Sequence, residues 1–323
     1  MRDASARNLK DAASDLAALE ESVETQHLTP GWITRDAPIV AADKRTRFQP
    51  ALWPYLTAKA ALDEAGHLVD LALAERRNLI MKNPAPGIAW ETSLTHVCAY
   101  QMILPGEQAH SHRHSCNALR VIIEGDGAYS IVDGERMPMN SGDVVLTPGN
   151  CWHGHGHRGD VPAYWLDCLD VPLGHLLETM YFMPHPDGIE PVVREVSASP
   201  FRFARDDIAR GLDRAPGDPE GRFGASIVLP TPGMASTGLL VFRLGAGVTT
   251  RRRRTTANRI YSVMSGSGVT EAGKVSMTWT RGDTFHVPSG VWFAHCASDD
   301  AQLVEMSDAP LMQFINHFRE ELE

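Results

Sequence analysis

The chain has few cysteines, no long apolar run and no excess of positive charge, and each scarcity excludes a class of protein. Its 323 residues include five widely spaced cysteines without a Cys-x-x-Cys pair, so we expect no disulfide framework and a reducing, cytoplasmic setting. Forty acidic against 30 basic residues give a net charge of −10, which argues against a nucleic-acid or anionic-membrane binder. No apolar run is long enough to span a bilayer, and the charged N-terminus predicts no secretory signal.

Apolar periodicity predicts helices near the ends of the chain and strands between them. Apolar residues recur at spacings of three and four over residues 4–24, and residues 58–73 can form a second helix. Residues 311–322 predict a closing amphipathic helix. In residues 75–173 and 225–306, short alternating runs separated by glycine, proline and aspartate predict antiparallel strands and tight turns. The clearest strands are residues 100–104, 119–123, 128–132 and 144–147.

The two β-rich regions repeat one another. Their turn residues recur in the same order. The first three turn residues of the two regions are 141 residues apart, and the later ones are 140 residues apart. The first set is Gly106, Gly125, Gly127, Gly142-Asp143, Pro148 and Trp152, and the second is Gly247, Gly266, Gly268, Gly282-Asp283, Pro288 and Trp292. A repeated strand-and-turn unit of this size predicts two barrels derived from one ancestor.

The repeat divides the chain into four parts. We expect an N-terminal helical segment over residues 1–74 and a first barrel over residues 75–173. A connector with some helix then covers residues 174–224, and a second barrel with the C-terminal helix covers residues 225–323. The predicted fold is therefore mainly β, with helices at both ends.

Histidines are concentrated in the first barrel, at positions that can share one metal ion. His112 and His114 lie two residues apart, so on a strand both side chains point to the same face. His153 follows 39 residues after His114, in a second alternating run. Three neutral imidazoles meeting on one side of an ion leave its other side open, which suits Fe(II), Mn(II), Zn(II) or Ni(II).

The spacing around these histidines resembles the two cupin motifs. Five residues separate Gly106 from His112, and four separate Pro148 from His153. The glutamate ligand common in cupins would fall at or beside Ala118, where no acid stands, so the resemblance implies a three-histidine subgroup. It also implies a bicupin, with two double-stranded β-helix (jelly-roll) barrels. In the second barrel the corresponding residues are Arg253, Thr255 and Phe293, so we expect one metal per chain.

The wider sequence is similar to the gentisate and salicylate 1,2-dioxygenases. The segments that carry this resemblance are Leu104-Pro105-Gly106-Glu107, Ala118-Leu119-Arg120, Ile123-Glu124-Gly125, Val132-Asp133-Gly134-Glu135-Arg136, Trp152-His153-Gly154-His155-Gly156 and Trp165-Leu166-Asp167. The resemblance implies an Fe(II) dioxygenase with one iron per chain. Such an enzyme uses O2 to open the ring of a 2-hydroxybenzoate between the carboxyl-bearing and hydroxyl-bearing carbons. It also implies a homo-oligomer, a tetramer in this family.

Strand alternation and the resemblance together suggest the residues that bind substrate. Arg120 points to the same face as His114 and could clamp the carboxylate, unless it pairs with an internal acid such as Glu124. The resemblance assigns a second carboxylate contact to Arg76 or its neighbour Arg77.

Two further roles come from the resemblance alone. It implies that His155 hydrogen-bonds the phenolic oxygen or relays its proton, and that Asp167 orients His155. Val97 stands where the family usually has an aromatic residue, so a wider pocket and a 5-substituted salicylate such as 5-nitrosalicylate are expected.

Two other functions fit the same barrel. A different metal could support an isomerase or lyase that consumes no oxygen. A non-catalytic cupin could bind a small ligand without turning it over. The run from Arg251 to Arg254 resembles a nucleic-acid patch, but on an acidic chain a solvated strand or an ion-pair surface between subunits is favoured.

Overall fold

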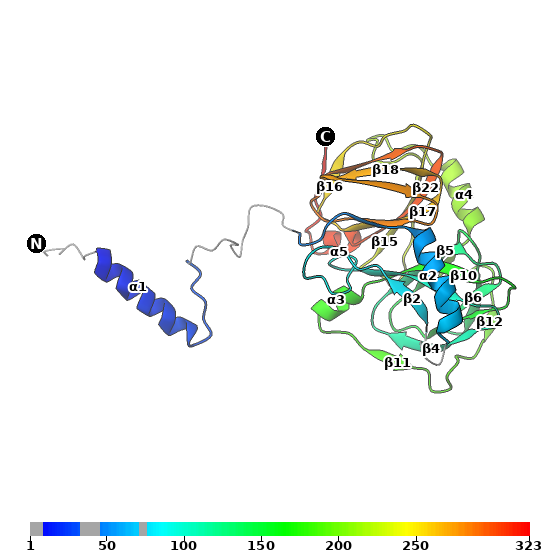
Figure 1. Cartoon of the computed structure of the whole chain (residues 1–323), viewed down its shortest axis with the longest axis horizontal. Coiled ribbons are helices and arrows are strands. Elements are labelled where there is room, and N and C mark those ends of the chain that lie inside the picture. Colours follow the sequence, from blue (N-terminus) through cyan, green and yellow to red (C-terminus); the bar gives the residue numbers. More distant parts are fainter. Residues whose placement is uncertain (1–8, 33–45, 71–75) are drawn as a thin grey trace, which may run out of the picture. The chain divides into compact units, whose positions relative to one another are not determined.

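The chain folds as two compact units, residues 1–44 and residues 45–323, in the computed structural model (Figure 1). The structure describes residues 9–32, 46–70 and 76–323. The first unit contains helix α1 (Leu9–Glu24), which confirms the predicted helix from Leu9 onward; residues 4–8 lie outside the described residues. Among the described residues, no helix is long and apolar enough to cross a bilayer.

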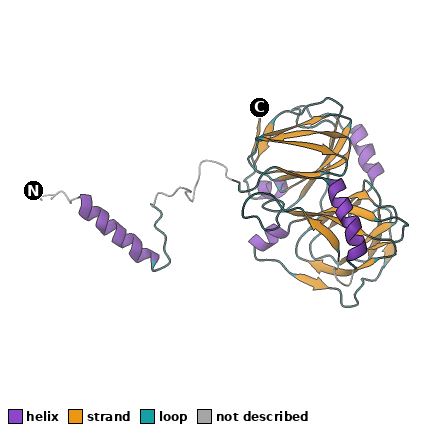
Figure 2. Ribbon diagram, viewed as in Figure 1, coloured by secondary structure: helices purple, strands orange, loops and turns teal. Residues whose placement is uncertain are grey.

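The first barrel is built from two six-stranded sheets that face each other (Figures 1 and 2). In hydrogen-bonded order, one sheet contains β13 (Arg202–Phe203), β8 (Val144–Thr147), β5 (Ala118–Glu124), β10 (Ala163–Leu169), β3 (Val97–Ile103) and β2 (Arg77–Ile80). The other contains β11 (Phe182–Pro184), β4 (Gln108–His114), β9 (His153–His157), β6 (Ala128–Val132), β7 (Glu135–Met139) and β12 (Arg194–Glu195).

The second barrel has the same two-sheet architecture, with one sheet of six strands and one of five. The six-stranded sheet contains β1 (Ala51–Trp53), β20 (Thr284–Val287), β17 (Arg259–Ser265), β22 (Ala301–Ser307), β15 (Gly238–Leu244) and β14 (Ser226–Leu229). The five-stranded sheet contains β19 (Val275–Thr280), β18 (Ser267–Ala272), β21 (Phe293–Ala297), β16 (Arg253–Thr255) and β23 (Glu320–Leu322). The predicted mainly-β bicupin fold is thus confirmed.

Three apolar cores stabilise these layers. One fills each barrel, around Trp165 in the first and around Trp279 in the second, and both side chains are fully buried. The third core joins the barrels, because Leu119 and Val121 on the outer face of β5 pack in one cluster with Ile260 of β17. Since residues alternate between the two faces of a strand, the neighbours of Leu119 and Val121 on β5 face the inside of the first barrel.

The sequence repeat is also a repeat in three dimensions. Gly142 and Gly282 both have a positive φ, 89° and 90°, which favours glycine at this turn. The aspartates that follow them accept equivalent backbone hydrogen bonds: Asp143 from the N–H of Asn140 at 3.0 Å and Asp283 from that of Thr280 at 2.9 Å. The same turn chemistry therefore leads the chain from one sheet to the other, between β7 and β8 in the first barrel and between β19 and β20 in the second.

The second predicted helix is displaced. Helix α2 (Tyr55–Leu68) begins directly after Pro54, three residues earlier than predicted, and ends before Val69, whose backbone is extended. Tyr55 and Leu62 are its buried residues, so packing against the barrels decides where it lies. The last part of the predicted 58–73 helix, residues 71–73, lies outside the described residues.

The prediction of one closing helix over residues 311–322 is wrong. Helix α5 (Ala309–Phe314) is short, and the chain then reverses, with Asn316 at a positive φ, to form β23. This strand pairs antiparallel with β16, where Arg253 opposes Leu322 and Arg254 opposes Glu321. The free edge of β16 supplies hydrogen-bonding partners that an isolated helix would not have, so tertiary pairing overrides the local periodicity.

The predicted connector and N-terminal segment contribute strands to the barrels. Within residues 174–224, β11 pairs with β4, β12 with β7 and β13 with β8, and helices α3 (Val171–Leu176) and α4 (Arg205–Arg214) flank them. Strand β1, which lies within residues 1–74, pairs with β20 of the second barrel. Each barrel therefore recruits chain from outside its predicted range.

Candidate metal centre

Three buried histidines meet inside the first barrel. His112 and His114 are on β4, and His153 opposes His112 across the β4–β9 pair. Their ring centroids are 4.5 to 5.4 Å apart, and one nitrogen from each lies within 4.8 Å of the others. The structure thus brings together the triad predicted from the sequence, and these residues could bind a metal ion.

Backbone carbonyls hold two of the rings in the orientation that a metal ligand needs. Nδ1 of His114 lies 2.9 Å from the carbonyl of Cys116, and Nδ1 of His153 lies 3.1 Å from that of Cys151. A ring that donates from Nδ1 presents the lone pair of Nε2 to the ion. Nε2 of His153 is buried and without a hydrogen-bond partner, so this donor set fits a divalent metal.

Burial keeps the site neutral before any metal binds. Desolvation, followed by the neighbouring His112, lowers the pKa of His114 to about 4. Desolvation and the charge of Arg120 hold the pKa of His153 well below its usual range. A buried alanine, Ala118, stands at the position where cupins commonly supply a glutamate ligand. The triad therefore offers no negative charge, and an anionic ligand would have to balance the metal.

Arg120 points into the same barrel but forms its ion pair with Asp167. The two residues oppose each other on β5 and β10, with 3.0 Å between Arg120 Nε and Asp167 Oδ1. This contact has the distance of an ion pair but not the alignment of a hydrogen bond. Arg120 also donates to the hydroxyl of Thr147 at 2.7 Å. The suggested internal partner Glu124 instead accepts a hydrogen bond from Tyr55, at 2.9 Å.

The expected contact between Asp167 and His155 is absent among the described residues. Asp167 accepts a hydrogen bond from the indole of Trp165 at 3.1 Å, and burial raises the pKa of its carboxyl group despite the opposing charge of Arg120. His155 is buried beside His153, with ring centroids 6.1 Å apart, and neither of its nitrogens has a hydrogen-bond partner. Because unsatisfied buried polar groups are uncommon, His155 is suited to bond a ligand.

The choice between Arg76 and Arg77 is decided by their partners. Both terminal nitrogens of Arg77 bond Glu107 at 2.7 Å, which draws that side chain away from the triad. A terminal nitrogen of Arg76 lies 3.0 Å from Nδ1 of His112. Arg76 is therefore the arginine at the triad.

Strand β3 forms the wall beside the Arg120–Asp167 pair. Ala99 opposes Asp167, so Val97 and Gln101 share its face, and both are buried. Gln101 is a buried polar residue that the sequence analysis missed, although the alternation along β3 could have revealed it.

Phe182 was also missed, because it lies in the predicted connector. Its ring centroid is 4.7 Å from that of His112, and its strand β11 pairs with β4. The fold thus adds an aromatic residue to the triad from outside the predicted barrel.

The fold and the site define a cupin with a histidine triad that could bind a metal ion, and comparison with known proteins defines the family. The cupin-domain family matches residues 99–169. Gentisate 1,2 dioxygenase 1 of Aquipseudomonas alcaligenes is 32% identical over 92% of this chain and 94% of its own length. The 5-aminosalicylate 1,2-dioxygenase of Comamonas sp is 31% identical over 95% of this chain and 90% of its own. A gentisate 1,2-dioxygenase of Ralstonia sp is 43% identical over 52% of this chain and 47% of that protein.

A solved structure agrees along the whole fold. The salicylate 1,2-dioxygenase of Pseudaminobacter salicylatoxidans superposes with a TM-score of 0.84 at 28% identity, covering 95% of this chain and 97% of that one. The chain belongs to the gentisate/salicylate 1,2-dioxygenase family. It is a ring-cleaving 1,2-dioxygenase, an oxidoreductase.

Proposed function

We propose that the chain binds one Fe(II) ion at His112, His114 and His153 and cleaves a 2-hydroxybenzoate with O2. Cleavage is proposed between the carboxyl-bearing and hydroxyl-bearing ring carbons. The observation that carries this proposal is a buried triad of histidines beside a buried arginine. When bound, the iron would supply a Lewis-acid and redox centre at which substrate and oxygen meet.

Charge balance favours a substrate with two anionic oxygens. The triad contributes no carboxylate, so a divalent ion would keep its full charge in a low-dielectric barrel. A 2-hydroxybenzoate can supply a carboxylate and an ionised phenolic oxygen on adjacent ring carbons. Neutral aromatic compounds should therefore bind poorly to this site.

The arginines would bind and orient the carboxylate. Arg120 is held by Thr147 and Asp167, so its guanidinium is already ordered before substrate arrives. A terminal nitrogen of Arg76 lies 3.0 Å from Nδ1 of His112, so this guanidinium is also beside the triad. In this proposal Asp167 positions the substrate indirectly, through Arg120, in place of the expected action through His155.

His155 would hydrogen-bond the phenolic oxygen. Its nitrogens are buried without partners, and its ring lies next to that of His153. A ligand oxygen at the metal would satisfy one of them and fix the ring in a single orientation.

Val97 supports a substrate with an added ring substituent. Val97 lies on β3, opposite Leu169 of β10 and on the same face as Ala99. A valine in place of an aromatic side chain leaves more room along this strand. We therefore propose a salicylate that carries a nitro or amino group at position 5, in place of the 5-hydroxyl of gentisate, as the preferred substrate class. The similarity to a 5-aminosalicylate 1,2-dioxygenase supports this choice.

Anaerobic reconstitution with Fe(II), followed by oxygen and a panel of 2-hydroxybenzoates, tests the proposal. We expect stoichiometric oxygen uptake and a ring-opened product. We also expect 5-nitrosalicylate and 5-aminosalicylate to be turned over faster than gentisate. Faster turnover of gentisate would reject the substrate class. Activity with zinc or nickel and without oxygen uptake, or ligand binding without turnover in the iron-loaded protein, would reject the dioxygenase itself.

A further inference from the structure

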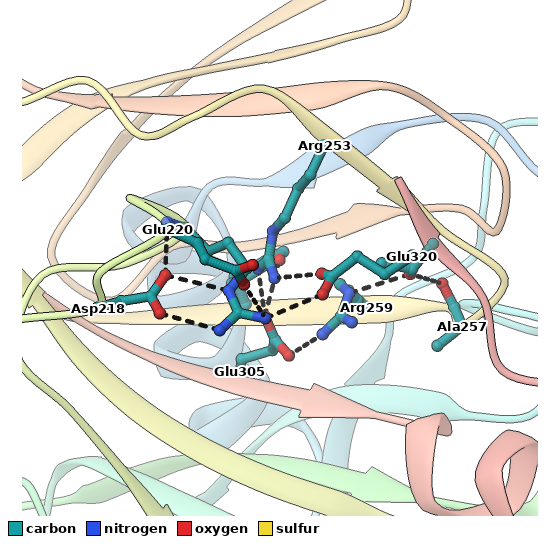
Figure 3. Close-up of polar contacts among 10 residues, drawn as sticks. Asp218, Glu220, Arg253, Ala257, Arg259, Glu305 and Glu320 are labelled. Carbon is teal, nitrogen blue, oxygen red and sulfur yellow. Dashed lines mark hydrogen bonds and ion pairs between the residues drawn. The ribbon is translucent and has the colours of Figure 1, made fainter. Parts of the chain in front are cut away.

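Arginines and carboxylates fill the second barrel at the place where the first barrel has its histidines (Figure 3). Arg253 opposes Phe293 across β16 and β21, as His112 opposes His153 across β4 and β9. The side chains of Arg253 and Arg259 are only 3% and 6% exposed. Fixed guanidinium charges thus stand where the related barrel can hold a metal cation.

Glu305 and Glu320 both pair with Arg253, and they are held very differently. Asp218 and Glu220 pair with the neighbouring Arg222, at 2.9 and 3.1 Å. Glu305, on the central strand β22, pairs with Arg253 at 3.2 Å, pairs with Arg259, and accepts a hydrogen bond from the Tyr261 hydroxyl at 3.0 Å. It opposes Tyr261 as Asp167 opposes Arg120 in the first barrel, so Glu305 belongs to the barrel itself.

Glu320 enters the cluster from the end of the chain. Its two oxygens lie 3.2 Å from Arg253 and 3.0 Å from Arg222. It lies on β23, a three-residue strand at the edge of the five-stranded sheet, where it pairs with β16. A short edge strand has few ladder hydrogen bonds to lose, so this carboxylate can leave its arginines without unfolding the barrel.

A cavity of about 350 Å³ adjoins the carboxylate. Its lining residues include both glutamates that pair with Arg253, three arginines and several apolar residues, among them Arg222, Arg253, Arg259, Phe223, Leu239 and Phe318. The guanidinium carbon of Arg253 lies 4.3 Å from the ring centroid of Phe223. This volume lies within the range of small-molecule sites, about 300–1,000 Å³, and cationic groups beside aromatic rings suit an aromatic acid.

We propose that the second barrel binds a small aromatic carboxylate, whose carboxylate takes the place of Glu320 on Arg253 and Arg222. The ring would lie against Phe223 and Phe318. Glu320 is then an internal competitor that occupies the site until a ligand displaces it. This site requires no metal and does not depend on the function proposed for the first barrel.

Binding of benzoate to the metal-free full-length protein tests this proposal by equilibrium dialysis. Glu320→Ala removes the competitor, so we expect its affinity for benzoate to exceed that of the unmodified chain about ten-fold, since a tethered group competes at roughly millimolar effective concentration or above. Glu321→Ala is the matched control, because Glu321 is the next residue of β23 and pairs with Arg254. Any binding in the first barrel is common to all three proteins and cancels in the comparison.

A second substitution locates the ligand. Adding Arg222→Gln to Glu320→Ala should abolish the gain in affinity, because Arg222 is one of the two arginines that Glu320 bonds. If Glu320→Ala does not fold, Glu320→Gln preserves the side-chain shape and should show the same gain. An affinity no higher than that of the Glu321→Ala control, or a gain that survives Arg222→Gln, would overturn the proposal.

Discussion

The buried pair of Arg120 and Asp167 allows a quantitative prediction about the first barrel. Asp167→Asn preserves the side-chain shape, and its amide oxygen can still accept the indole hydrogen bond that Asp167 receives at 3.1 Å. What the substitution removes is the negative charge 3.0 Å from Nε of Arg120. Arg120 would then be a buried cation without its carboxylate.

The expected loss of stability follows from the burial of both groups. Removing one partner of a buried ion pair costs about 3–5 kcal/mol, since the remaining charge keeps its desolvation penalty. For a unit of this size we expect the melting temperature to fall by roughly 5–10 °C. Arg120→Gln combined with Asp167→Asn should be less destabilised than Asp167→Asn alone, because no unpaired charge remains.

Binding of substrate provides an independent test of the Arg120–Asp167 pair. A carboxylate ligand would neutralise the unpaired charge of Arg120, so salicylate should raise the melting temperature of Asp167→Asn more than that of the unmodified protein. The value of kcat should fall on the order of 100-fold, since the guanidinium is no longer held in one orientation. Differential scanning calorimetry with and without salicylate, together with steady-state kinetics, measures these effects. An unchanged melting temperature for Asp167→Asn, or a double variant less stable than it, would refute the reasoning.

Three further predictions concern the triad, the pocket wall and a buried acid. His153→Ala should retain less than about a tenth of an equivalent of iron after gel filtration, measured by elemental analysis, because two histidines hold the ion poorly; full iron loading would contradict the assignment. Val97→Phe should lower kcat/KM for 5-nitrosalicylate about ten-fold or more relative to salicylate, since the added ring occupies space along β3; an unchanged ratio would place the substituent elsewhere. Burial raises the pKa of Glu190 to about 7, so the free energy of unfolding should fall as pH rises from about 4.5 to 7, where the folded state holds more protons than the unfolded state. Glu190→Gln should flatten this slope by about 1–3 kcal/mol in urea unfolding at pH 5 and pH 8, and an unaltered slope would exclude Glu190 as its source.

Much of the first barrel's site could be predicted because its information is local. The spacing of His112, His114 and His153 places three imidazoles on neighbouring strands, and strand alternation alone turns Arg120 toward the same interior. The repeat of glycine, aspartate and proline fixes the turns of both barrels, because each turn needs particular residues whatever surrounds it. These features depend on backbone geometry within a few residues.

The sequence could not predict which contacts form between distant segments of the chain. Glu124 is close to Arg120 in the chain and Asp167 is distant, and only the register of β5 against β10 places Asp167 beside Arg120. Likewise Arg77 is drawn to Glu107, which leaves Arg76 at the triad. The two acids carry the same charge, and so do the two arginines. Only the packing of the folded chain therefore determines which of each pair lies at the site.

The sequence by itself determined two repeated barrels, a histidine triad in the first that could bind a metal ion, and the absence of the corresponding imidazoles from the second. Only the tertiary structure decided that the chain's end becomes a strand and carries Glu320 to Arg253 and Arg222. The physical reason is that a helix is favoured by contacts three or four residues apart. Strand β23 is instead stabilised by the edge of β16 and by arginines 67 and 98 residues earlier in the chain, which no local pattern records.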